Sequence, residues 1–222
     1  MPHRPVFHHV TGRWRPRWRG RIHGGASLVT IPAGVALTVA AQGTAATIAV
    51  AIYASSLCAL FTTSACYHLF TRSEQAQRIM QRVDHGMVYV LIAGTYTPVC
   101  ILALPRVLGS VFLCVIWSAA AVGIGLKVSW RGVKTASVMY LVIGWAIVLV
   151  LPWAYDRIGA VGLALYAAGG IIFSVGAVLF YKQWPSLKPD VFGFHEVWHV
   201  MTVVAVTLQF GASAILVTRL TT

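Results

Sequence analysis

Two histidines one helical turn apart open the last long apolar stretch of the chain. His195 and His199 flank Glu196 in the sequence HEVWH, and the apolar run MTVVAVTLQFGASAILV follows directly. Residues four apart share one face of an α-helix, so both imidazoles can bind one metal ion. The motif also fits the H-E-x-x-H pattern of zinc metalloproteases, in which the glutamate is the general base. Alternatively, Glu196 is a first-turn acid favoured by the helix dipole, or a partner that supports a histidine.

A serine and a histidine with the same spacing stand near the end of an earlier apolar stretch. Ser64 and His68 are four residues apart, and His68 could supply a third nitrogen. Three histidines and a water form the open type of zinc site, in which the pKa of the water falls to about 7. We therefore expect Zn²⁺ on His68, His195 and His199. Asp84 could hold the water and accept its proton, and Ser64 could donate a hydrogen bond to the water or to a substrate oxygen.

Each of these residues also has a structural interpretation. His195 and His199 could bond lipid headgroups at the membrane surface. Asp84 could cap a helix, because carboxylates suit a helix N-terminus. Ser64 could bond the carbonyl one turn back in its own helix. His23, which precedes the first apolar stretch, is expected at the membrane interface rather than at the metal.

These side chains need a scaffold that holds them at one depth of a membrane. The 222 residues are 58% hydrophobic and 10% charged, whereas a soluble domain carries roughly 25% charged residues. A helix needs about 20 apolar residues to cross ~30 Å of hydrocarbon, and backbone groups in lipid must be satisfied within the span. We expect an all-α bundle of seven transmembrane helices at 26–222 after a basic tail at 1–25. The expected spans are 26–42, 46–70, 85–104, 107–127, 136–155, 159–180 and 196–217.

The distribution of positive charge predicts which way this bundle faces. With seven spans, all but Arg106, Arg157 and Arg219 of the 17 lysines and arginines fall on one side. The positive-inside rule places that side and the N-terminus in the cytoplasm and the C-terminus outside. The candidate site residues then lie together near the inner leaflet of the cell membrane.

The basic residues bear on the partners of the chain. The net charge of +12 does not indicate nucleic acid, because the charges sit in the tail and in short loops where membrane orientation explains them. The tail at 1–25 is expected to be mobile and to lie on anionic lipid headgroups. A signal peptide ending near residue 43 is an alternative for the first span, although its basic region is too long. Membrane lipid is the expected substrate, and the sequence leaves the oligomeric state open.

Three stretches of the sequence resemble the motifs of a known family. SACYHLF at 64–70 resembles an S-x₃-H motif, VDHGMVYVLIAGTYTP at 83–98 a third-span signature, and HEVWH at 195–199 an H-x₃-H motif. On these motifs the chain resembles the hemolysin III branch of the progestin and adipoQ receptor (PAQR) family, within the CREST superfamily of membrane hydrolases. The resemblance runs from about His23 to the C-terminus.

The resemblance implies seven helices, an inward N-terminus and an intramembrane zinc held by three histidines. By motif position the ligands are His68, His195 and His199, with Ser64 and Asp84 near the zinc water. Receptor members of the family are linked to ceramidase-like hydrolysis of a lipid amide, and the bacterial branch is named for haemolytic activity. Related chains often carry an acidic residue near the start of the first span, whereas this tail has none.

Three functions fit these observations. The first is a zinc-dependent hydrolase of a lipid amide or ester at the inner leaflet, with Asp84 as general base. The second is a non-enzymatic membrane protein, either a lipid sensor or a lytic protein. In it, zinc has only a structural role and holds the second, third and seventh helices together. The third is an intramembrane metalloprotease in which Glu196 activates the water.

Overall fold

Long helices packed side by side make up nearly the whole molecule. The computed structural model describes residues 7–8, 12–129 and 133–219; Arg4 and Arg131, which the charge count uses, lie outside them. Two short strands, β1 (Phe7–His8) and β2 (Arg13–Trp14), pair antiparallel before the first helix. The helices are α1 (Arg21–Ala40), α2 (Thr44–Phe70), α3 (Glu74–Leu102), α4 (Arg106–Val128), α5 (Val133–Trp145), the 3₁₀ helix η1 (Ala146–Val150), α6 (Leu151–Tyr181) and α7 (Phe194–Arg219).

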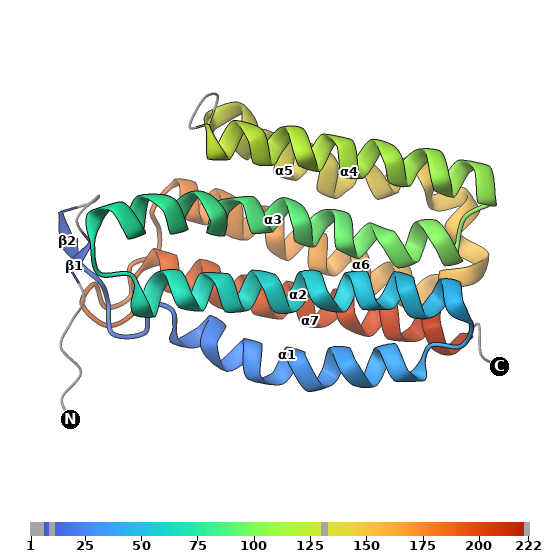
Figure 1. The fold of residues 1–222 in the computed structure, drawn as a ribbon, viewed down its shortest axis with the longest axis horizontal. Coiled ribbons are helices and arrows are strands. Elements are labelled where there is room, and N and C mark those ends of the chain that lie inside the picture. Colours follow the sequence, from blue (N-terminus) through green and yellow to red (C-terminus); the bar gives the residue numbers. More distant parts are fainter. Residues whose placement is uncertain (1–6, 9–11, 130–132, 220–222) are drawn as a thin grey trace.

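The helices run up and down along the long axis of the molecule (Figure 1). Helix α1 packs on α2, α2 on α3, and α3 on α4, while α7 packs on α6 and also reaches α1. The β1–β2 pair, the α2–α3 connection and the α6–α7 connection lie at one end of the bundle, on the left of Figure 1. We call this the histidine end, because α2 finishes there and α7 begins there, each with its histidine motif.

The outside of the bundle is apolar over most of its length. Val39, Val107 and Leu28 are 80%, 77% and 75% exposed, and a soluble monomer rarely carries apolar patches of this extent. Six helical segments of the described chain are long and apolar enough to cross a membrane. The chain is therefore a multi-pass membrane protein. Those segments are Arg21–Ala40, Thr44–Phe70, Glu74–Leu102, Arg106–Val128, Thr135–Tyr181 and Phe194–Arg219.

The segment Thr135–Tyr181 joins the two stretches that the sequence assigns to separate spans. It is 47 residues long, or about 70 Å as a continuous helix. Inside it the 3₁₀ helix η1 precedes α6, and α6 is broken at Gly159, which has φ 72° and ψ 167°. Glycine adopts this positive φ without the steric penalty of a Cβ. In Figure 1, α5 and the part of α6 after the break run in opposite directions.

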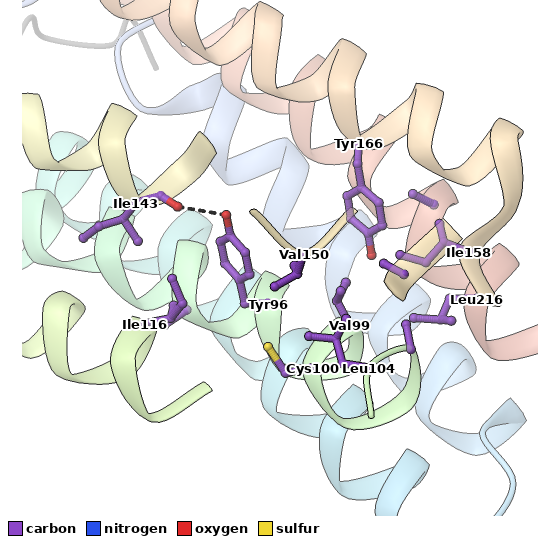
Figure 2. Close-up of a cluster of buried hydrophobic side chains, with 14 of the residues drawn as sticks. Tyr96, Val99, Cys100, Leu104, Ile116, Ile143, Val150, Ile158, Tyr166 and Leu216 are labelled. Atoms are coloured by element: carbon purple, nitrogen blue, oxygen red, sulfur yellow. Dashed lines mark hydrogen bonds between the residues drawn. The ribbon is translucent and has the colours of Figure 1, made fainter. Parts of the chain in front are cut away.

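A buried tyrosine forms hydrogen bonds with backbone groups at the junction of α5 and η1 (Figure 2). The Tyr96 hydroxyl donates to the carbonyls of Ile143 (2.8 Å) and Gly144 (3.0 Å) and accepts from the Ile147 N–H (2.7 Å). A change of helix type leaves such groups without their regular partners, and in hydrocarbon an unpaired backbone group is costly. The phenol lies in a core built from α3, α4, α5, α6 and α7.

Two helices begin a full turn or more before the residue that the hydropathy pattern predicts. Helix α1 begins at Arg21 instead of residue 26, and α3 begins at Glu74 instead of residue 85. The extra turns of α3 carry Glu, Gln, Ala and Arg, which are strong helix formers without being apolar. Ser73 caps α3 by accepting from the Ala76 N–H, so the alternative that Asp84 caps this helix is wrong. Asp84 lies in the third turn.

Candidate metal centre

Helices α2 and α7 bring three histidines together at the histidine end. The possible ligand atoms of His68, His195 and His199 all lie within 4.8 Å of one another. Their ring centroids are 4.8–5.1 Å apart, and the ring planes meet at 50–89°. Because each lone pair lies in the plane of its ring, inclined rings can direct their nitrogens toward a common point. The three side chains could therefore hold one metal ion.

The ring nitrogens of this cluster fit a metal better than a hydrogen-bond network. Both nitrogens of His68 and Nδ1 of His199 are buried and have no hydrogen-bond partner among the described residues. An unmade hydrogen bond in a buried site costs about 1–3 kcal/mol. A bound ion would remove this cost by giving the buried nitrogens a partner. Two nitrogens at ~2.1 Å from one tetrahedral zinc are roughly 3.4 Å apart, so the side chains would draw closer together on binding the ion.

Asp84 and Ser64 form a second polar pair next to this cluster. Ser64 is 2% exposed and lies one turn before His68 on α2. It is within hydrogen-bonding reach of the Asp84 carboxyl on α3. Asp84 is not a member of the close group of histidines among the described residues. Ser64 thus lies one helical turn from His68 and within hydrogen-bonding reach of Asp84.

Glu196 is fully buried and both of its carboxylate oxygens are engaged. One oxygen forms an ion pair with Arg19, and the other accepts from the Gly193 N–H at 2.8 Å. The latter contact is the third-residue half of a capping box at the start of α7. Because both carboxylate oxygens already have partners, this geometry favours the supporting role of Glu196 over that of a general base.

The sequence of this chain is similar to those of known proteins of one family. A model of the family described as haemolysin-III related matches residues 12–210. The chain belongs to the haemolysin-III-related family. Hemolysin-3 of Bacillus cereus is 33% identical over 138 residues, which cover 61% of this chain and 60% of that protein. A Hemolysin-3 homolog of Bacillus subtilis (strain 168) is 33% identical over 129 residues, 57% of each chain. The chain thus spans about 60% of the length of the curated relatives it matches.

The part of the tail at residues 12–20 is packed against the protein, and we call it the N-terminal strap. This haemolysin-III-related chain was expected to carry a mobile tail, but Arg15 in the strap is 5% exposed. Its guanidinium donates to the carbonyls of Tyr67 (3.1 Å) and His68 (2.5 Å) and lies over the Tyr67 ring. Burial lowers the pKa of Arg15, although an arginine stays protonated in a protein. It therefore caps the C-terminal end of α2.

The strap reaches both helices that carry the histidines. Backbone N–H groups of Arg17 and Trp18 donate to the carbonyls of Asp190 and Val191 before α7. Gly20, with φ 81°, lies so close to α2 that a Cβ on it would meet the His68 Cβ at 2.6 Å. The strap therefore crosses the histidine end from α2 to α7.

The sequence reasoning misplaced one histidine of this haemolysin-III-related chain. His23 was expected at the membrane interface, but it is 3% exposed and its ring stacks on that of His199 with centroids 3.9 Å apart. The close packing of α1 on α2 and α7 buries it. Its position two residues into an apolar helix was a weak signal that it faces the bundle.

Proposed function

We propose that this chain is a membrane-embedded zinc hydrolase that cleaves a lipid amide or ester near the inner leaflet. The observation that carries the proposal is the convergence of His68, His195 and His199. Buried nitrogens of His68 and His199 have no hydrogen-bond partner among the described residues. An all-imidazole donor set suits zinc. Three protein ligands leave a position open for water or substrate, which is the arrangement of catalytic rather than structural zinc.

Bound zinc would supply a Lewis acid and lower the pKa of a bound water. The other roles belong to the chain itself. Asp84 would accept the proton of the attacking water. Ser64, one helical turn from His68 and within hydrogen-bonding reach of Asp84, would orient that water or the substrate carbonyl. The ion pair of Glu196 with Arg19 speaks against the metalloprotease alternative, because it occupies the carboxylate that would act as the base.

A cavity of about 180 Å³ supports a substrate with an aliphatic chain. It lies between α3, α5 and α6, and Val88 on its wall is one helical turn from Asp84. Its lining is mainly apolar, with Gln209 of α7 among the few polar groups. An acyl chain in this cavity would place the bond to be cleaved toward Ser64 and Asp84.

The proposal includes seven crossings of a bacterial cytoplasmic membrane, with the histidine end inside. The charge asymmetry of the sequence supports this orientation. The length of Thr135–Tyr181 and its break at Gly159 support two crossings within that segment.

A second candidate function is a non-enzymatic protein in which the metal only joins α2 and α7. It is favoured by one observation, that Asp84 lies outside the close group of histidines in the described chain. The relatives carry the name hemolysin, and a lytic activity would be compatible with such a role.

The test combines metal analysis with turnover on protein purified in detergent. Wild type should contain about one zinc per chain and His68→Ala should lose it; a metal-free wild type would contradict both candidates. Asp84→Asn should keep the zinc and lose hydrolysis of short-chain ceramides and lysophospholipids, on which wild type is screened. Equal turnover by Asp84→Asn and wild type would exclude Asp84 as the base. Absence of turnover in a zinc-loaded wild type, with dye release from liposomes by both wild type and His68→Ala, would favour the lytic candidate.

A further inference from the structure

His23 is a fourth buried imidazole that touches the candidate metal centre. It lies in the first turn of α1, and its ring stacks on the His199 ring with an interplanar angle of 14°. The edge of Phe61 on α2 packs against it, with ring centroids 5.0 Å apart. Three helices thus fix this one side chain.

The orientation of the His23 ring indicates that His23 is not a fourth ligand of the same metal ion. The planes of His23 and His199 are nearly parallel, so their in-plane lone pairs run side by side and do not converge on one ion. The rings of His68, His195 and His199, in contrast, are mutually inclined by 50–89°. His23 can hold the His199 ring in place by its face, as groups that contact metal ligands commonly do.

Stacking alone does not account for a histidine at this position. A phenylalanine ring would pack equally well against His199 and Phe61, without polar atoms. Both nitrogens of His23 are buried, and neither makes a hydrogen bond of regular geometry with a described residue, although the His199 backbone is nearby. Each unmade hydrogen bond costs about 1–3 kcal/mol. The nitrogens therefore point to a polar ligand that enters the centre from outside the chain.

We propose that His23 positions His199 by stacking and binds, through a ring nitrogen, the small oxygen ligand that the centre accepts. That ligand would be a water, a carboxylate or the carbonyl oxygen of a substrate. A neutral imidazole can donate to such an oxygen through one nitrogen and accept from a water through the other. This inference rests on the proposed metal centre.

The test uses two substitutions that separate the ring from its nitrogens. His23→Phe keeps the stack and removes both nitrogens, whereas His23→Ala removes both features. His85→Phe is the matched control, because His85 also buries a nitrogen without a partner in the described chain but lies on α3 outside the cluster. Zinc affinity is measured by competition with a chelator. Acetate affinity is measured from the visible spectrum of the cobalt-substituted protein, with acetate as the oxygen-ligand probe.

His23→Ala should weaken zinc binding about tenfold, as loss of a group that supports a metal ligand typically does. His23→Phe should bind zinc like wild type and bind acetate about tenfold more weakly, because it lacks the hydrogen bond to the charged oxygen. Wild-type acetate affinity in His23→Phe, or wild-type zinc affinity in His23→Ala, would overturn the inference. Loss of zinc from His23→Phe as complete as from His68→Ala would make His23 a direct ligand and also overturn it. A wild type that binds no zinc would instead refute the metal centre itself.

Discussion

Arg19 and Glu196 form an ion pair whose two partners are buried to different degrees. The Glu196 side chain has no exposed surface, whereas that of Arg19 is 14% exposed. Removal of one partner leaves the other charge unpaired, and the cost of an unpaired charge grows with its burial. The two single substitutions should therefore have unequal effects.

Arg19→Met should destabilise the protein more than Glu196→Gln does, by about 3 kcal/mol or more for the arginine change. The double variant should be more stable than Arg19→Met, because it contains no unpaired buried charge. The midpoint of thermal unfolding in detergent, followed by intrinsic fluorescence for all four proteins, checks this order. Zinc content should persist in Glu196→Gln. Equal midpoints for the two single variants would contradict the asymmetric burial.

The residues of the site differ in how far the sequence could predict them. The pairs Ser64/His68 and His195/His199 follow from a four-residue spacing, which is a local property of any helix. The contact of Arg15 with the His68 carbonyl joins residues 53 positions apart, and that of Arg19 with Glu196 joins residues 177 apart. No local pattern encodes such contacts, because they depend on how the strap folds back over the bundle.

At the scale of elements, Gly20 sets how closely the strap approaches α2. Its φ of 81° is unfavourable for a residue with a Cβ, and a Cβ there would collide with that of His68. Gly20→Ala should therefore lower stability by roughly 1–3 kcal/mol and weaken zinc binding, because α2 must shift at His68. Gly25→Ala is the control, since nothing lies within 4 Å of its Cβ position. Unfolding midpoints and chelator competition measure both effects, and identical behaviour of the two variants would contradict the close approach.

Tyr96 supports a different element, the junction of α5 and η1. Tyr96→Phe removes one hydroxyl that serves three backbone groups, so it should destabilise the protein by about 1–3 kcal/mol. Zinc content should not change, because Tyr96 lies 12 residues after Asp84 on α3, about 18 Å along the helix. Tyr181→Phe, at an exposed hydroxyl, provides the comparison in the same thermal unfolding assay. A Tyr96→Phe midpoint equal to that of Tyr181→Phe would show that water or another group satisfies the junction.

The elements themselves were predictable where hydropathy and helix length coincide. α2, α4 and α7 begin and end within a few residues of the expected spans. α3 begins 11 residues earlier than its span, because hydropathy marks where the hydrocarbon ends and the helix continues into a polar, helix-forming stretch. The break at Gly159 lies at the boundary that the sequence places between the spans 136–155 and 159–180, where Asp156 and Arg157 interrupt the apolar run. The 3₁₀ turn η1 could not be predicted, because its residues AIVLV are uniformly apolar.

At the scale of the whole molecule, the number of crossings decides which face of the membrane the metal centre serves. Thr135–Tyr181 would span about 70 Å as a straight helix, more than twice the ~30 Å of hydrocarbon. A single crossing would therefore leave a long apolar segment in water or in the headgroup region. Two crossings with a reversal at Gly159 bury the whole segment and place Lys182 and Lys188 on the same side as the strap, as the positive-inside rule requires.

Reporter fusions at two positions distinguish these topologies. With seven crossings, a fluorescent protein inserted at residue 186 should fluoresce in the cytoplasm, and alkaline phosphatase fused after residue 222 should be active outside. With six crossings both results reverse, because the connection before α7 moves outside and the C-terminus returns to the cytoplasm. The fusions are compared at equal expression. Phosphatase activity at residue 186 together with fluorescence at residue 222 would refute the seven-helix topology, and with it the placement of His195 and His199 at the inner leaflet.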